Sequence, residues 1–355
     1  MGRRMGCIGL DVGSFGCRAV QLAWTGTGVE LVQVASLERP RRGDGKIKPA
    51  ELAPVIGGFL RQNRFHGKEV ATAVSHEDSV IRVVSMPPMS EEELGPAVRY
   101  EAERYIPFAP GDCVTDYAVL GETRAGGAPQ LEVLLVAARR SSVEALLEAV
   151  RKAGFRSVGV DAEALAAGRA LLRNGGDGNG EGAGDGSAGN SPLRVLCDIG
   201  HTCTNISVFR GRSLRIHRSV TVAGATMLDR AARTVGLERA SPQAVFAGSA
   251  GQSRTTVAPA LTPVWEELVT ELNRSIDFCR SQEGEQPDRV LLTGGALRVP
   301  GLVAHLRERV AIPVEVANPV EGMMAGRSVR TGFLTEVVPE LAVAVGLALR
   351  GLPVS

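Results

Sequence analysis

The sequence predicts an α/β protein with a duplicated fold: two similar lobes that face each other, and a small α+β subdomain inserted in the first. Three observations predict it. An apolar run ends at Asp198, turns through Gly200 and restarts as a strand. The same pattern occurs around Asp11 and Gly13, about half a chain earlier. Between the two hairpins, alternating strand and helix signals form a unit the size of a small subdomain.

Each hairpin has the chemistry of a phosphate-binding turn. Glycine lets the backbone turn tightly and approach a ligand closely, and successive N–H groups in a turn can surround phosphate oxygens. An Asp repels phosphate, but it can hold Mg²⁺ through water, because this ion keeps several waters. Asp and Gly also favour turns for conformational reasons alone. One copy would favour that simpler explanation, whereas two copies favour a nucleotide held from both sides.

Composition argues against several other classes of protein. The 355 residues include 40 basic and 39 acidic side chains, so the basic excess typical of nucleic-acid binding is missing. Aromatic residues make up only 4% of the chain, which argues against stacking platforms for single strands. The six cysteines form no close Cys-x-x-Cys pair, which fits a reducing cytoplasm better than a disulfide scaffold.

No segment reads as a signal peptide or a membrane span. The basic start is interrupted by Asp11 and Gly13, and the apolar run at 341–349 is far too short to cross a bilayer. We therefore expect a soluble, cytoplasmic protein without direct membrane insertion, although it can dock on a membrane partner.

Residues 1–78 are expected to form part of the first lobe, and residues 79–157 the inserted subdomain. In the first part the predicted elements are strands at 7–11, 18–25, 29–37 and 69–74, a basic loop at 39–48 and a helix over 50–63. In the subdomain, Ser90 and Glu93 have the spacing of a capping box, and Pro107 ends the helix that follows. Its predicted elements are strands at 80–84, 113–120, 131–138 and 155–160, and helices over 91–104 and 141–153.

Residues 158–192 are expected to combine a return helix, 161–173, with a flexible surface loop. The loop, 174–191, contains eight glycines and no large apolar residue, so it cannot bury enough surface to fold. Residues 193–355 form the second lobe, and its last helix is expected to return to the first. The predicted elements are strands at 195–198, 205–210, 213–220, 289–293 and 314–316, helices over 225–235, 261–281, 302–309 and 339–351, and a poorly patterned stretch at 236–257.

Three motifs resemble, in their order, the phosphate-1, phosphate-2 and adenosine motifs of the actin-like ATPase superfamily, which has a duplicated ribonuclease H-like fold. These motifs are Asp11-Val12-Gly13-Ser14, Asp198-Ile199-Gly200-His201-Thr202 and Leu292-Thr293-Gly294-Gly295-Ala296. The resemblance implies ATP and Mg²⁺ as ligands, with Asp11 and Asp198 holding the metal through water. It implies phosphate contacts for Gly13, Ser14, Gly200 and Thr202, and nucleoside contacts for Gly294 and Gly295.

Further candidate residues follow from the same resemblance, each with a simpler alternative. Glu271 and Arg274 share one face of a helix and resemble an adenosine-contacting pair, or form a solvated ion pair. Glu163 resembles a water-orienting Glu, or is an acid that favours a helix start. Gly224 resembles a phosphate-side or ribose-side glycine. His201 is expected to touch a phosphate or to face solvent.

The chain resembles more narrowly the type IV pilus assembly protein PilM family, over nearly its whole length except the Gly-rich loop. The stretches that carry this resemblance are 82–87, 100–108, 275–278, 318–319 and 339–348. It implies an ATP-binding protein, with slow ATPase activity left open, that binds the cytoplasmic N-terminal peptide of a PilN-like inner-membrane protein. The resemblance makes residues 79–157 the partner-binding subdomain and places Ile106 and Phe108 beside the groove for that peptide. The alternative is that they are ordinary core residues, which we expect to hold for one of them. Self-association is left open.

Two other functions are compatible with the superfamily. A sugar-type kinase would need a substrate-side carboxylate as base, and no sugar-binding insertion is apparent. A filament-forming divisome protein like FtsA would end in a membrane-binding amphipathic tail, which the final residues 352–355 do not form.

Overall fold

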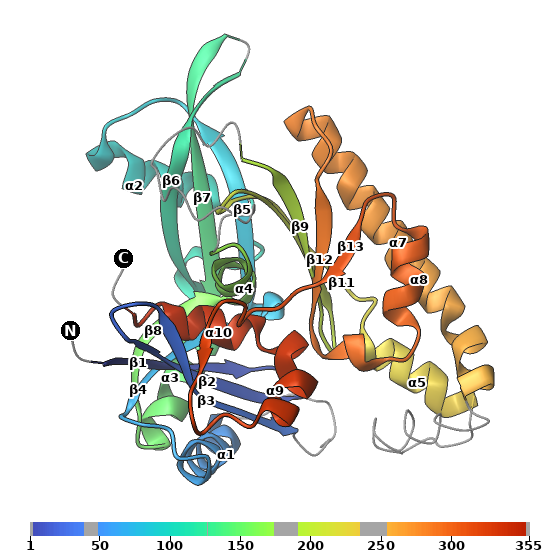
Figure 1. Ribbon diagram of the computed structural model, residues 1–355. Helices are drawn as coiled ribbons and strands as arrows, with labels where there is room; N and C mark the ends of the chain where they lie inside the picture. The colour runs from blue at the N-terminus through green and yellow to red at the C-terminus, as the bar shows by residue number, and fades with distance from the viewer. Residues whose placement is uncertain (1–2, 39–48, 126, 174–190, 235–253, 353–355) are drawn as a thin grey trace.

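The computed structural model describes all residues except 1–2, 39–48, 126, 174–190, 235–253 and 353–355. The stretch 174–191, apart from its last residue, and most of the unpatterned stretch 236–257 therefore lie outside the described residues. In the described part of the chain, three sheets form two facing lobes and an additional subdomain (Figure 1).

The first lobe is built on a sheet with the strand order β14-β3-β2-β1-β4-β8. β1, β2 and β3 are antiparallel neighbours, whereas β4 and β8 continue the sheet in parallel from β1. α1 and α3 cover one face, and their buried core includes Ile56, Leu60 and Val150. The strands and helices are β1 (Arg4–Val12), β2 (Gly16–Trp24), β3 (Val29–Glu38), α1 (Pro49–Gln62), β4 (Glu69–Val74), α3 (Arg140–Lys152), β8 (Arg156–Ala162) and β14 (Met324–Ala325).

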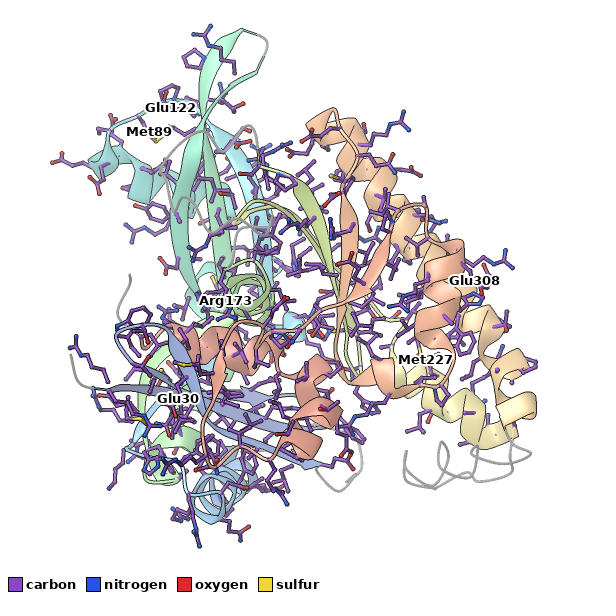
Figure 2. The ribbon with its side chains drawn as sticks, viewed as in Figure 1. Glu30, Met89, Glu122, Arg173, Met227 and Glu308 are labelled. Atoms are coloured by element: carbon purple, nitrogen blue, oxygen red, sulfur yellow. The ribbon has the colours of Figure 1, made fainter. Side chains whose placement is uncertain are left out.

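The second lobe repeats this plan in its sheet, β11-β10-β9-β12-β13. Again three antiparallel strands come first in the chain, and two more continue the sheet in parallel from β9. The duplication predicted from the two hairpins is therefore seen in the structure as the same strand order in both sheets. Met227 of α5, labelled in Figure 2, lies in the core between this sheet and its helices. The elements are β9 (Leu193–Ile199), β10 (Thr204–Arg210), β11 (Ser213–Val220), α5 (Gly224–Thr234), α7 (Arg254–Glu283), β12 (Arg289–Thr293), α8 (Leu302–Arg309) and β13 (Val314–Val316).

The inserted subdomain is smaller than residues 79–157. Its sheet has the order β5-β7-β6, covered by α2. α3 instead packs on α1 in the first lobe, and β8 pairs with β4, because their apolar residues complete that core. The subdomain elements are β5 (Ser79–Met86), α2 (Glu91–Ala102), β6 (Cys113–Ala125) and β7 (Ala128–Arg139). The capping box is confirmed: Glu93 N–H donates to Ser90 Oγ, and Ser90 N–H to Glu93 Oε2 at 2.9 Å.

The C-terminal part of the chain returns to the first lobe. α10 (Ala342–Leu349) packs between the first sheet and α4 (Glu163–Leu171), where small residues allow close approach. A Cβ at Gly346 would lie 1.7 Å from the carbonyl oxygen of Ala166. The sequence analysis missed α9 (Thr331–Val337) and β14, and it merged α10 with the 3-10 turn Val338–Glu340 into one helix.

No single helix in the described residues is long and apolar enough to cross a membrane. Thr331–Glu340 and Ala342–Leu349 together satisfy length and composition, but they meet at 94°. All six cysteines are buried free thiols.

Candidate nucleotide site

A cavity of about 920 Å³ lies between the two lobes. Both hairpin turns line it, together with the Gly294-Gly295 turn after β12, Gly224 at the start of α5 and Glu163 at the start of α4. These contributions come from five separate parts of the chain. The structure therefore brings together every predicted site residue except Glu271 and Arg274.

The two hairpins correspond residue by residue. In the first, Asp11 of β1 is paired with Arg18 of β2; in the second, Asp198 of β9 is paired with Asn205 of β10. The turns also touch across the cleft, because Thr202 Oγ1 donates to Ser14 Oγ at 3.2 Å. Beside this contact, the rings of Phe15 and His201 lie 5.0 Å apart. Two Asp-bearing turns thus face one space from opposite lobes.

At two positions of the cleft, neighbouring atoms leave no room for a side chain larger than that of glycine. Gly294 has φ of 105°, and a Cβ there would lie 2.6 Å from Asp198 Oδ1. Gly224 packs against the second turn: its N–H donates to the carbonyl of Gly200 at 3.0 Å, and a Cβ would lie 3.1 Å from that oxygen. The adenosine-type turn and the start of α5 are therefore fixed directly against the second hairpin.

The carboxylates of Asp11, Asp198 and Glu163 are close enough in the cleft to repel one another. Burial, and then the charge of Asp11, raise the pKa of Asp198 to about 7, although Arg18 opposes this shift. Burial, followed by Asp11 and Asp198, raises the pKa of Glu163 well above its usual range. A divalent cation would relieve this repulsion, so the residues present fit Mg²⁺. No group of three or more His, Cys, Asp or Glu residues among those described could ligate a metal directly.

One ionic cluster in the cleft was missed by the sequence analysis. Glu340, 8% exposed, accepts from Arg18 Nε at 2.8 Å with one oxygen and from Arg298 Nε at 2.6 Å with the other. Arg298 also pairs with Glu38 at 3.6 Å. The cluster joins β2, β3, the turn after β12 and the chain before α10. Arg18 could have been found from its place opposite Asp11, but nothing in the local sequence marks Glu340.

A thiol–imidazole contact was also missed. Cys203 Sγ lies 2.9 Å from His76 Nδ1 in the cavity wall. Burial, with the charges of Glu163 and Asp198, raises the pKa of the thiol, and burial lowers the pKa of His76. Both groups are therefore neutral at pH 7, and the thiol has none of the thiolate character that a nucleophile needs.

Two predicted residues lie elsewhere, and their assignment to adenosine is corrected. Glu271 and Arg274 of α7 do not line the described cavity. Glu271 accepts from Arg274 at 2.8 Å and also pairs with Arg218 of β11. The E-x-x-R spacing here serves an ion-pair network that holds α7 to the sheet, because that face of the helix is turned toward β11.

Two ribonuclease H-like halves that face each other across such a cleft define the actin-like ATPase fold. The comparisons agree: a solved structure described as the PilM–PilN type IV pilus biogenesis complex is 30% identical over 98% of both chains, with a TM-score of 0.81. The ethanolamine utilization protein EutJ from Carboxydothermus hydrogenoformans is 15% identical over 97% of this chain and 89% of its own, with a TM-score of 0.54, and shares the fold.

The family described as type IV pilus assembly protein PilM matches residues 9–352. The chain belongs to this family. The match favours a pilus assembly protein over the sugar kinase and the FtsA-like divisome protein that the sequence analysis left open.

Proposed function

We propose that this protein binds Mg²⁺–ATP in the cleft between its lobes. The phosphates lie between the two turns, in contact with Gly13, Ser14, Gly200, His201 and Thr202. Asp11 and Asp198 hold the metal through water, and the nucleoside lies against Gly224, Gly294 and Gly295. When bound, the metal neutralises phosphate charge and keeps both Asp carboxylates ionised.

One observation carries this proposal: the Asp-bearing turns of the two lobes meet, with Thr202 Oγ1 3.2 Å from Ser14 Oγ. Backbone N–H groups of tight turns suit phosphate oxygens, and two carboxylates facing one space suit a hydrated divalent cation. Glu163, in the same cavity, orients a water for slow hydrolysis.

Calorimetry tests the metal assignment. Asp11→Ala and Asp198→Ala should each weaken Mg²⁺–ATP binding by about tenfold or more, equivalent to about 1.4 kcal/mol, while ATP binding in EDTA changes little. Asp288→Ala is the matched control, because Asp288 forms an exposed pair with Arg289 away from the cleft. Equal losses with and without metal, in folded variants, would contradict the assignment.

The protein also binds the cytoplasmic N-terminal peptide of a PilN-like membrane protein, which places it at the cytoplasmic face of the inner membrane. The similar solved structure is described as a complex with PilN. The junction of the subdomain with the first lobe supports this role. There Arg139 lies 4.4 Å above the ring of Phe108 and pairs with Asp78 at 3.3 Å. Ile106 is buried in the subdomain core, and Phe108 packs at its margin.

A further inference from the structure

The outer edge of the inserted subdomain is an uncovered strand. β6 is the last strand in the order β5-β7-β6, and in the described part of the chain nothing pairs with its outer side. β5, at the opposite edge, packs against β11 of the second lobe. Figure 1 shows β6 on the side of the subdomain that faces away from that lobe. An edge strand of this kind presents backbone N–H and C=O groups to another chain.

One of these outward groups can be identified. The N–H of Tyr117 donates to Oδ1 of the neighbouring Asp116 at 2.9 Å. Because its acceptor is a side chain of its own strand, this N–H is assigned to the outer side of the sheet, away from β7. Since backbone direction alternates along a strand, the N–H of Thr115 points the same way. Among the described residues, the acceptor for the Tyr117 N–H is a side chain of the same strand, which an incoming backbone carbonyl can replace.

The edge presents exposed apolar side chains on both faces. Tyr117 and Val119 lie on the α2 face and are 38% and 49% exposed, whereas Val114 lies on the opposite face and is 40% exposed. α2 forms a flank, because a Cβ at Gly95 would lie 3.4 Å from Tyr117 Oη. The chain has three tyrosines, Tyr100, Tyr105 and Tyr117, and all are exposed on this subdomain. Exposed tyrosines grouped on one unit are typical of interaction surfaces.

The negative charge of this surface indicates a partner with a positively charged segment. Residues 91–125, which span α2 and β6, contain eight acidic and three basic side chains, although the whole chain has a net charge of +1. Asp116 and Glu122 are exposed on β6 itself, and Figure 2 shows Glu122 near the free end of the subdomain. A second copy of this edge would place like charges opposite each other, which is unfavourable. A basic strand would complement it.

We propose that β6, flanked by α2, binds an extended basic segment of another protein as a fourth strand of the subdomain sheet. The main chain of that segment pairs with β6, its apolar residues cover Val114 or Tyr117 and Val119, and its basic residues meet the acidic surface. This site lies on the outer edge of the subdomain, and none of these residues lines the cleft between the lobes.

A nine-residue fluorescent peptide of alternating Lys and Val tests the proposal by anisotropy with the full chain. The peptide should bind, and binding should weaken as salt rises. Tyr117→Pro removes an outward N–H while the ladder with β7 remains, and it should weaken binding at least about tenfold. Val119→Ser should weaken binding as well. Val316→Ser is the matched control, because Val316 is a 39% exposed valine on the edge strand β13.

Three results would overturn the proposal even if Tyr117→Pro fails to fold. The first is equal binding by the Val119→Ser and Val316→Ser variants. The second is equal binding of a peptide of alternating Glu and Val. The third is a concentration-dependent dimer in sedimentation that Val119→Ser abolishes, since this would identify a second copy as the occupant. Amide shifts confined to residues 114–120 on adding the Lys–Val peptide would support it.

Discussion

At the scale of single residues, the two hairpins of the cleft have the same strand register but differ in the side chain opposite the Asp. The position opposite the Asp is Arg18 in the first hairpin and Asn205 in the second. Arg18 is held by Glu340, from the chain just before α10. The positive charge beside Asp11 therefore depends on a residue 322 positions away. Both partners are 8% exposed, so their pairing is an energetic requirement of the fold.

Glu340→Gln should accordingly destabilise the protein. The variant leaves the buried Arg18 and the partly buried Arg298 without their shared counter-charge, and removing one member of a buried pair costs about 3 kcal/mol. Urea unfolding measures this loss. Glu101→Gln is the control, because Glu101 pairs with the exposed Arg104 at 3.0 Å on α2, and such pairs contribute about 0–1 kcal/mol. Similar losses in the two variants would show that the Glu340 cluster is not a stabilising unit.

At the scale of elements, the packing of α10 brings the C-terminal part of the chain against β1, the first strand. It is apolar on every side and buried between the first sheet and α4. Its small residues set the distance: a Cβ at Gly9 of β1 would lie 2.0 Å from the carbonyl oxygen of Ala344. Gly346 makes the equally close approach to Ala166. Backbones this near to each other leave no room for side chains.

Gly346→Ala should therefore destabilise the protein by about 1–3 kcal/mol or more, because the added methyl meets backbone that cannot move away cheaply. The same substitution at Gly58 of α1 is the control, since no atom lies within 4 Å of a Cβ there. Gly58→Ala should stabilise the helix by up to about 1 kcal/mol. Thermal unfolding distinguishes the two, and a neutral Gly346→Ala would contradict the packing described for α10.

At the scale of the whole molecule, the subdomain contacts both lobes. Its Ile81 and Leu134 pack against Phe209 and Leu214 of the second lobe. At the rim of that contact, Arg215 of β11 forms a bidentate pair with Glu132 of β7. The other end of the subdomain meets the first lobe at Phe108 and Arg139. A partner bound at that end therefore contacts a unit that is fixed to both sides of the nucleotide cleft.

Phe108→Leu should weaken binding of the PilN-like N-terminal peptide by about tenfold while Mg²⁺–ATP affinity stays unchanged, because a few apolar anchors dominate peptide binding. Phe278→Leu is the control, since Phe278 is exposed on α7, far along the chain from this junction. Titration calorimetry with both ligands gives the result. Unchanged peptide affinity in Phe108→Leu, in a folded protein, would place the peptide elsewhere.

Much of this organisation was predictable from sequence because it is local. The Asp–Gly turns, the capping box at Ser90 and the alternation of strand and helix depend on residues a few positions apart, and the repeat of the hairpin revealed the duplication. Two hairpins were sufficient to place Asp11 and Asp198 in one cleft. The family resemblance rested on short motifs of the same kind.

Only the tertiary structure decided the rest, because it depends on which surfaces meet. α3 and β8 read as part of the subdomain, yet their apolar faces complete the core of the first lobe. Glu271 and Arg274 have a binding-site spacing, but their helix face is turned to Arg218. Glu340 looks like an ordinary helix-start acid and is instead the buried partner of Arg18. Spacing along a chain determines which residues share a face, whereas burial and long-range pairing determine what that face contacts.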